Sequence, residues 1–403
     1  MTETTRSGRW LVIGVFFLSS SINYLDRQSL ATLAPLFRAE FHLNNADYGW
    51  ILAAFSVTYA AAAPFAGLLI DRIGLNRGIM ISIGLWSLAG ITTGFTRGLG
   101  GLVACRAWLG LAEAGGIPAA GKAMHEYLEP AERALGNGLN QAAVFLGAIL
   151  APPVATWLAV RYQWRAAFVV TGAAGLLWIP VWNWVARGAP PVRKSAREPL
   201  ARSLAILCEP RMWGFIIANA LSMVAYSLWS NWTTLYLVEV NKLTFVQAAY
   251  VAWLPPLAAM LGGFAGGWLS FRWARAGVSP LAARARVCLL CALAGLVAIA
   301  IPFAPNAAWA MAGISLSILA VSAFSVNLYT MPLDVYEAAR AAFAVSLLVS
   351  AYGAMQAVAS PLLGALIDCY GYLPVCAVAS VTSLAAYAVL RATGAVPSVT
   401  HPA

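Results

Sequence analysis

Four charged side chains stand inside long apolar stretches of this 403-residue sequence. Asp26 and Arg27 interrupt the first such stretch, and Arg106 and Glu113 interrupt the fourth. A charged side chain at the centre of a membrane-spanning helix costs about 2.5–3.5 kcal/mol on insertion scales, so these residues need partners or a function. Carboxyl groups can take up and release protons, and a guanidinium offers a fork of N–H groups that matches a carboxylate.

The spacing of the four residues limits how they can meet. Arg106 and Glu113 are seven residues apart, so they return to nearly the same face of a helix, about 10.5 Å along its axis. The side chains of Asp26 and Arg27 point in directions about 100° apart around the axis of their helix, so one can face a cavity while the other reaches around its edge. Two explanations stay open: a structural ion-pair cluster joining the two helices, or a site that binds an anion and transfers protons. A cluster alone would stabilise poorly, because desolvation tends to cancel the attraction.

The composition places these residues in a membrane protein. Hydrophobic residues make up 61% of the chain and charged residues 10%, which excludes an ordinary soluble domain. Strand alternation of the outer-membrane barrel kind is missing, so helices are the spanning structure that remains. We expect an all-α membrane protein with twelve transmembrane helices in two six-helix bundles. The predicted spans are 10–37, 48–70, 79–96, 99–124, 134–158, 164–186, 211–238, 246–270, 282–303, 308–332, 341–367 and 372–391.

The distribution of basic residues predicts the orientation. With an inside N-terminus, eighteen of the 25 Lys and Arg residues lie on the inner side, and the five on the outer side are Arg38, Arg97, Arg161, Arg165 and Lys242. The positive-inside rule then places both termini in the cytoplasm of a multi-pass protein of the plasma membrane, which in bacteria is the inner membrane. The net charge of +10 is explained by this topology, and nucleic-acid binding is not expected. The first stretch is too long and too charged for a cleaved signal sequence.

The chain divides into two halves. The segment 188–209 is a long, polar, proline-containing interruption, so we expect a cytoplasmic linker there between an N-terminal bundle, 1–187, and a C-terminal bundle, 210–403. Shifted by 200 residues, 66–72 resembles 266–272, and each ends a second helix in its half. Related bundles in one orientation are typical of transporters that rock about a site near the membrane midplane.

A loop signature in the first half points to a family. The pattern G-x-x-x-D-R-x-G-x-x-R is formed by Gly67, Asp71, Arg72, Gly74 and Arg77. It resembles the loop motif of the major facilitator superfamily, in which a charged helix end and turn would hold one conformation closed from the inside. The alternative is a solvated turn that obeys the positive-inside rule.

A second resemblance covers most of the chain and is densest before residue 190. The segment 106–118 resembles the fourth-helix pattern R-x-x-L-G-x-x-E-A-x-x-x-P of the anion:cation symporter family, which includes hexuronate and galactonate transporters and the animal transporters related to sialin. The segment 23–27, Asn-Tyr-Leu-Asp-Arg, is similar to its first-helix motif. Matches to its second helix are Trp50, Phe55, Tyr59, Pro64, Gly67, Asp71 and Arg72.

This resemblance implies roles for individual residues. Arg27 and Arg106 would hold the substrate carboxylate, Asp26 and Glu113 would take up protons, and Tyr59 would touch the substrate. The chemistry is consistent, because a nearby Arg keeps a buried acid ionised. An anion that occupies the Arg weakens this effect, so that proton uptake becomes easier. Substrate binding and proton uptake would be coupled in this way.

The sequence also departs from the family pattern. Ala63 stands where the family often has Gln, so the identity of the substrate is left undetermined. Phe271 stands where the family often has Asp, which weakens the second copy of the inner gate. Neutral polar residues in apolar spans could bind substrate hydroxyls or could equally form helix-to-helix hydrogen bonds. These are Gln141, Asn231, Asn327 and Gln356.

Together these observations predict a proton-coupled symporter that imports a small organic anion by alternating access. A sugar acid, such as a hexuronate or an aldonate, is the expected substrate. A monocarboxylate or an aromatic acid is the alternative, favoured by the sixteen Trp residues and by Ala63. We expect a monomer in the lipid bilayer whose other partners are the anion and protons.

No cofactor and no metal site are expected. Cys288 and Cys291 have C-x-x-C spacing but lack a second pair or nearby His and acidic partners. An intramembrane enzyme would need a nucleophile or metal constellation, and His125 with Glu126 is the one hint of it. A passive channel is not expected either, because the buried acids would have no function in it.

Overall fold

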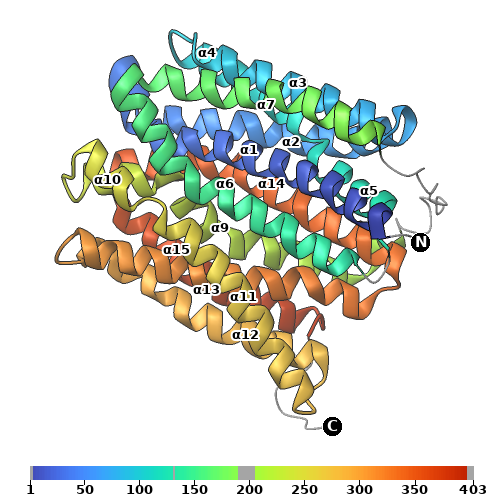
Figure 1. The fold of residues 1–403 in the computed structure, drawn as a ribbon. Helices are drawn as coiled ribbons and strands as arrows, with labels where there is room; N and C mark the ends of the chain where they lie inside the picture. Colours follow the sequence, from blue (N-terminus) through green and yellow to red (C-terminus); the bar gives the residue numbers. More distant parts are fainter. Residues whose placement is uncertain (1–2, 130–131, 189–204, 397–403) are drawn as a thin grey trace. The chain divides into compact units, whose positions relative to one another are not determined.

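The computed structural model describes residues 3–129, 132–188 and 205–396. Regular structure within these ranges is entirely helical, as the composition predicts (Figure 1). The elements are α1 (Glu3–Phe41), α2 (Asn45–Ile73), α3 (Leu75–Thr93), α4 (Leu99–Glu113), α5 (Gly116–Tyr127), α6 (Arg133–Tyr162), α7 (Trp164–Arg187), η1 (Ala205–Cys208), α9 (Pro210–Glu239), α10 (Phe245–Val251), α11 (Leu254–Arg275), α12 (Pro280–Ala294), η2 (Gly295–Phe303), α13 (Ala307–Val335), α14 (Ala338–Tyr370) and α15 (Tyr372–Ala392).

Many of these helices can cross a membrane. Eight helical segments in the described ranges are long and apolar enough to do so by length and composition: 135–162, 164–187, 210–239, 245–275, 280–303, 307–335, 343–370 and 372–392. α4 and α5, with 15 and 12 residues, are each shorter than the about 20 residues that a span needs. Exposed Phe65, Phe95 and Leu177 are suited to contact with lipid. The expected total of twelve spans stays a prediction.

The chain forms two compact units. The first contains Met1–Ala196 together with Thr244–Trp253, and the second contains Arg197–Leu243 and Leu254–Ala403. Most of the predicted linker, 188–209, lies outside the described residues. Asp26, Arg27, Arg106 and Glu113 all belong to the first unit.

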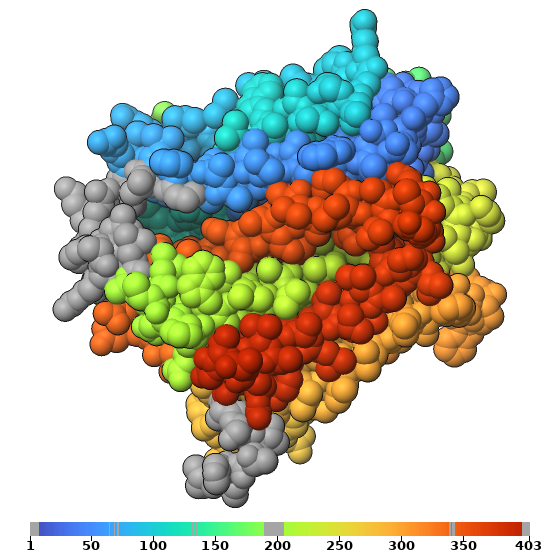
Figure 2. All heavy atoms as spheres, turned by 180° about the vertical axis from the view of Figure 1, so that it is seen from behind, coloured from blue at the N-terminus to red at the C-terminus, as the bar shows by residue number. Residues whose placement is uncertain are grey.

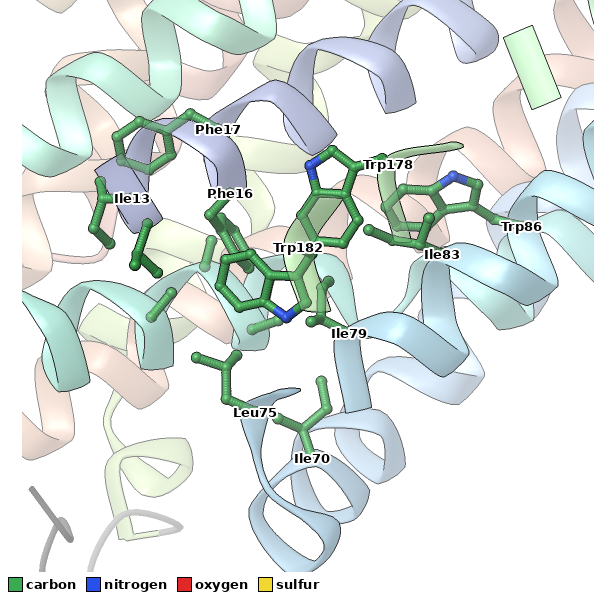
Figure 3. Packing of buried hydrophobic residues seen from close by; sticks show 14 of the residues in the cluster. Ile13, Phe16, Phe17, Ile70, Leu75, Ile79, Ile83, Trp86, Trp178 and Trp182 are labelled. Atoms are coloured by element: carbon green, nitrogen blue, oxygen red, sulfur yellow. The ribbon is translucent and has the colours of Figure 1, made fainter. Parts of the chain in front are cut away.

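An aromatic cluster fixes one end of α1 against α7. The rings of Trp178 and Trp182 stack with centroids 5.2 Å apart, and Phe16 meets Trp182 edge to face at 5.8 Å (Figure 3). The indole N–H of Trp178 donates to the carbonyl of Val15 at 2.6 Å, which satisfies the one polar atom of that ring. Because lipid is as apolar as a protein core, close packing rather than removal from water stabilises this contact.

Hydrogen bonds to Glu40 fix the other end of α1. The Glu40 carboxylate accepts hydrogen bonds from the Trp164 indole at 2.6 Å and from the Arg165 guanidinium at 2.9 Å. Arg165 also donates to the carbonyl of Thr96, between α3 and α4, at 3.3 Å. The two hydrogen bonds hold the pKa of Glu40, which lies beyond the predicted span, below its usual range. α1 is therefore attached to α7 on both sides of Asp26.

The chain breaks between α4 and α5, directly after Glu113. Pro118 has no N–H to donate to the carbonyl four residues earlier, and Gly115 and Gly116 weaken the helix at the same place. The hydroxyl of Ser82 on α3 donates to the carbonyl of Ala112 at 2.5 Å, which satisfies an acceptor near the helix end. The break leaves Glu113 as the last residue of α4.

α1 and α6 approach closely through a glycine. A Cβ added at Gly147 would overlap the backbone carbonyl of Ser21, whose own hydroxyl donates to the carbonyl of Ala143 at 2.7 Å. Small residues at such contacts allow the helix backbones to approach within the membrane.

Gly147→Ala should therefore destabilise the protein by about 1–3 kcal/mol, because α1 or α6 must shift to make room. The measurement is the apparent melting temperature of the purified protein in detergent. Gly138→Ala on the same helix is the matched control, since a Cβ there meets no atom within 4 Å. Equal melting temperatures of the two variants would contradict the close packing of α1 on α6.

In the second unit, α9 packs against α13, α14 and α15. Figure 2 shows α9 between α14 and α15 on one face of this unit, and α9 packs against both. The amide of Asn219 on α9 donates to the carbonyl of Leu348 on α14 at 2.7 Å. Arg284 on α12 forms a two-pronged ion pair with Asp334 on α13, at 2.5 and 3.2 Å. Polar contacts between helices therefore tie this unit together as well.

Candidate functional site

The structure brings the four charged side chains together within the first unit. Asp26 and Arg27 lie in the middle of α1, and Arg106 and Glu113 lie on α4. Asp26, Arg106 and Glu113 are buried, with exposed fractions of 4%, 2% and 2%. Arg27 differs, because 27% of its side chain is exposed. The cluster therefore reaches solvent-accessible space through Arg27.

Arg27 and Glu113 form a close ion pair between α1 and α4. One guanidinium nitrogen of Arg27 donates to Oε2 of Glu113, while Oε1 of Glu113 has no hydrogen-bond partner among the described residues. The guanidinium carbon also lies 4.6–5.6 Å from the ring centroids of Tyr24, Phe55 and Tyr59. Such contacts attract a cation and restrict its orientation. Arg27 is therefore held by an acid and three aromatic rings.

Asp26 has a different set of contacts. Its Oδ1 accepts a hydrogen bond of 2.7 Å from the hydroxyl of Thr171 on α7. A Cβ added at Gly90 on α3 would lie 3.3 Å from the same oxygen, so the backbone of α3 closes that side. Oδ2 of Asp26 has no hydrogen-bond partner among the described residues. Arg106 attracts Asp26 electrostatically, and so, less strongly, does Arg27.

Arg106 has two hydrogen-bonding groups that are left open. Its guanidinium carbon lies 5.5 Å from the ring centroid of Phe168 on α7. Its Nε and Nη2 have no hydrogen-bond partner in the described part of the chain. These two atoms form one edge of the guanidinium, the edge that binds a carboxylate through two parallel hydrogen bonds. Asp26 and Glu113 both interact with Arg106 electrostatically, so opposite charges lie near its guanidinium although Nε and Nη2 have no hydrogen-bond partner in the described part of the chain.

The open groups of this cluster match the chemistry of an anion and of protons. A buried donor without a partner costs about 1–3 kcal/mol, and more when it is charged, so the open edge of Arg106 is expensive unless a ligand uses it. The two open carboxyl oxygens, Oδ2 of Asp26 and Oε1 of Glu113, are positions at which a proton can bind. Acids and bases are equal in number, so an added anion and an added proton keep the cluster neutral.

The family model described as Major Facilitator Superfamily matches residues 16–347. The chain belongs to the major facilitator superfamily. It is therefore a multi-pass membrane transporter and not an enzyme.

Several members of the superfamily are similar to this chain. The hexuronate transporter of Escherichia coli K12 is 28% identical over 397 residues, which cover 93% of this chain and 91% of that protein. The galacturonate transporter of Dickeya chrysanthemi is 29% identical over 65% of this chain and 81% of that protein. A probable sulfoacetate transporter of Cupriavidus necator is 30% identical over 81% of this chain and 80% of that protein. The resemblance to hexuronate and galactonate transporters that the motifs indicated is thus confirmed.

A solved structure shows the same fold. It is a bacterial homologue of the human lysosomal transporter Spinster in an inward-facing and unoccupied conformation. The TM-score is 0.75 at 19% identity, and the match covers 98% of this chain and 96% of that chain. The all-helical major facilitator fold predicted from the sequence is therefore confirmed.

The superfamily loop signature lies at the end of α2. Gly74 ends this helix with a φ of +87°, a conformation that favours glycine. Gly67 faces α5, where an added Cβ would lie 3.7 Å from the ring of Pro118. Arg72 and Arg77 are exposed, and the side chain of Asp71 lies outside the described part of the structure. The gating role of this loop stays a prediction.

The predicted polar residues occupy varied positions. Gln141 is exposed on α6 of the first unit, while Asn231, Asn327 and Gln356 belong to the second unit. The amide of Asn231 donates to the carbonyl of Ser227, one turn earlier on α9, at 2.8 Å.

Asn327 on α13 joins two helices. Its amide donates to the carbonyl of Gly266 on α11 at 3.1 Å. This is a helix-to-helix hydrogen bond, one of the two roles that the sequence allowed for Asn327. Substrate roles for the predicted polar residues stay predictions.

Sequence reasoning missed several members of the site. Thr171, Gly90 and Phe168 received no role, although all three surround the cluster. Thr171 is a polar residue in an apolar span, which is a signal, but Thr is common in membrane helices because it can bond to its own backbone.

No metal site accompanies the cluster in the described part of the chain. Groups of three or more His, Cys, Asp and Glu side chains that could hold an ion are not found among the residues that the structure describes. Cys288 is buried and Cys291 is half-buried, and both are free thiols.

Proposed function

We propose that this protein is a proton-coupled symporter that imports a small organic anion by alternating access. The observation that carries the proposal is the open Nε–Nη2 edge of Arg106, buried beside two acids that each have one open oxygen. A carboxylate fits this edge in a two-pronged arrangement. Arg27 assists from the exposed side of the cluster, where it is paired with Glu113.

Proton coupling follows because the substrate carboxylate competes with Asp26 and Glu113 for the two arginines. While no substrate is present, Arg27 pairs with Glu113, and Arg106 attracts Asp26. A substrate carboxylate that binds to Arg106 weakens the attraction of this base for the acids, which then accept protons more readily. Binding of the anion and binding of the proton therefore favour each other, and the coupling is reciprocal.

A sugar acid, such as a hexuronate or an aldonate, is the substrate that we propose. The relatives named for hexuronate, galacturonate and D-galactonate support this class. The second candidate, a monocarboxylate or an aromatic acid, is favoured by Ala63, which supplies no polar group for substrate hydroxyls, and by the aromatic rings around Arg27. Tyr59, Gln141, Asn231, Asn327 and Gln356 remain candidates for contact with the substrate.

The proposal includes the arrangement in the membrane. Twelve spans result when α4 and α5 form one span and α1, α2 and α3 form one each, in addition to the eight apolar segments. The two bundles are residues 1–187 and 210–403, with the linker 188–209 and both termini in the cytoplasm, as the distribution of Lys and Arg supports. The protein acts as a monomer in the inner membrane.

A thermal-shift experiment tests the proposal. D-galacturonate and D-galactonate should raise the melting temperature of the purified protein, and more at mildly acidic than at neutral pH, because proton and anion bind together. D-galactose, which lacks the carboxylate, is the matched control and should cause no shift. Equal shifts with galactose and galacturonate would contradict the role of Arg106. A larger shift with benzoate would favour the second candidate substrate.

A further inference from the structure

Thr171 is a buried polar residue that the transport scheme has not used. It lies on α7 with 3% of its surface exposed, and its hydroxyl donates to Oδ1 of Asp26 on α1 at 2.7 Å. The carbonyl of Phe168, one turn earlier on α7, is 3.3 Å away and is the longer alternative acceptor. The shorter contact therefore joins two helices that are far apart in the sequence.

The packing of α3 on α7 holds Thr171 in place. A Cβ added at Gly172 would lie 2.6 Å from the carbonyl oxygen of Ser87 on α3, and one added at Gly175 would overlap the Ser87 hydroxyl. α3 therefore packs closely on α7 over one helical turn, through its backbone at Gly172 and through the Ser87 side chain at Gly175. Gly90, on the next turn of α3, closes the space beside Oδ1 of Asp26. Little room remains for Thr171 or for the Asp26 carboxyl to rotate.

We propose that Thr171 is a positioning residue, which fixes Oδ1 of Asp26 and thereby reserves Oδ2 as the oxygen that takes up the transported proton. This inference rests on the proposed symport function. A hydroxyl suits the task because it can donate to Oδ1 in both states of the acid. When Oδ2 is ionised, Oδ1 is a carboxylate oxygen, and when Oδ2 carries the proton, Oδ1 is a carbonyl oxygen, so the bond persists through the cycle.

The charges around Asp26 make this positioning necessary. Arg27 is its neighbour on α1, and Arg106 and Glu113 act on it from α4. α3 and α7 contribute Gly90 and Thr171. A carboxyl group free to rotate could turn either oxygen toward either base. The hydrogen bond from Thr171 on α7 fixes Oδ1 of Asp26, so the proton reaches Oδ2.

The test is the pH dependence of D-galacturonate uptake into proteoliposomes. Thr171→Val keeps the size of the side chain but removes the donor, so the ionised form of Asp26 loses a stabilising bond and the proton is held more tightly. The pH of half-maximal uptake should rise by about one unit, since a hydrogen bond to a charged group is worth about that much. Thr171→Ser keeps the hydroxyl and should restore the wild-type profile.

A matched control separates this effect from a general loss of packing. Thr93→Val removes a hydroxyl that is also buried but donates to a carbonyl of its own helix, Ala89, at 2.8 Å. This variant should keep the wild-type pH profile. If Thr171→Val is not recovered folded, Thr171→Cys replaces it, because a thiol of similar size is only a weak donor.

Two outcomes overturn the inference, and a third outcome concerns the function alone. A wild-type pH profile for Thr171→Val, or a shifted profile for Thr171→Ser, would show that the hydroxyl does not position Asp26. Accumulation of D-galacturonate by Asp26→Asn under a pH gradient would instead refute proton coupling through Asp26. If Asp26→Asn loses accumulation while Thr171→Val behaves as wild type, the function stands and the positioning role falls.

Discussion

Replacing Arg106 by lysine should weaken binding of D-galacturonate by about a hundredfold or more, although the positive charge is kept. The substitution removes the Nε–Nη2 edge, which has no partner in the described part of the chain and which we propose for the substrate carboxylate. An ammonium group is a single, strongly hydrated point charge and cannot form two parallel hydrogen bonds to one carboxylate. Asp26 and Glu113 would still face a cation, so the charge balance of the cluster is preserved.

Binding measured by isothermal titration calorimetry on the purified protein would decide this prediction. Arg97→Lys is the matched control, because Arg97 is exposed and lies outside the cluster. It should bind D-galacturonate as the wild type does. If Arg106→Lys also bound with wild-type affinity, a two-pronged contact at this residue would be excluded. The cluster would then be better described as a structural ion-pair network.

Glu113→Gln should abolish accumulation of the substrate driven by a pH gradient while leaving substrate exchange intact. Glutamine has nearly the same size and its amide oxygen can still accept the hydrogen bond from Arg27, but it cannot take up a proton. Loss of the negative charge leaves the two bases less neutralised, so affinity for an anion should be unchanged or higher. Net symport needs the proton, whereas exchange needs only the binding site.

Uptake into proteoliposomes measures both activities. Accumulation is followed with a pH gradient, and exchange is followed as counterflow of labelled against unlabelled D-galacturonate at equal pH on both sides. Glu129→Gln is the matched control, because its carboxylate is 51% exposed and its contact with Arg9 at 3.5 Å is a surface pair of small energetic value. Concentrative uptake by Glu113→Gln would exclude this residue as a proton carrier.

The two variants also separate the alternatives that the sequence left open. An ion-pair cluster with a purely structural purpose would be expected to satisfy its donors and acceptors, as Arg284 and Asp334 do in the second unit. The cluster in the first unit pairs one base with one acid, and it leaves the Nε–Nη2 edge of Arg106 and one oxygen each of Asp26 and Glu113 open. Buried charges without hydrogen-bond partners are costly, which favours a functional explanation.

Several properties of this protein were determined by the sequence alone. Long apolar segments predict membrane helices, because backbone polar groups in lipid must be satisfied within the segment. The loop signature that ends at Arg77 and the fourth-helix pattern that begins at Arg106 identified the superfamily, and the comparisons confirmed it. The seven-residue spacing of Arg106 and Glu113 correctly placed both on one side of α4, since helix periodicity is a local property.

Only the tertiary structure decided which groups meet. Nothing in the spacing of Asp26 and Arg27 indicates that Arg27 pairs with Glu113 while Asp26 is held by Thr171, 145 residues away. Those pairings depend on how α1 is rotated and how closely it approaches its neighbours. Contacts between distant residues set both quantities, such as the packing of α1 on Gly147. Periodicity fixes the face of a helix on which a side chain lies, but the partner on the next helix follows from packing in three dimensions.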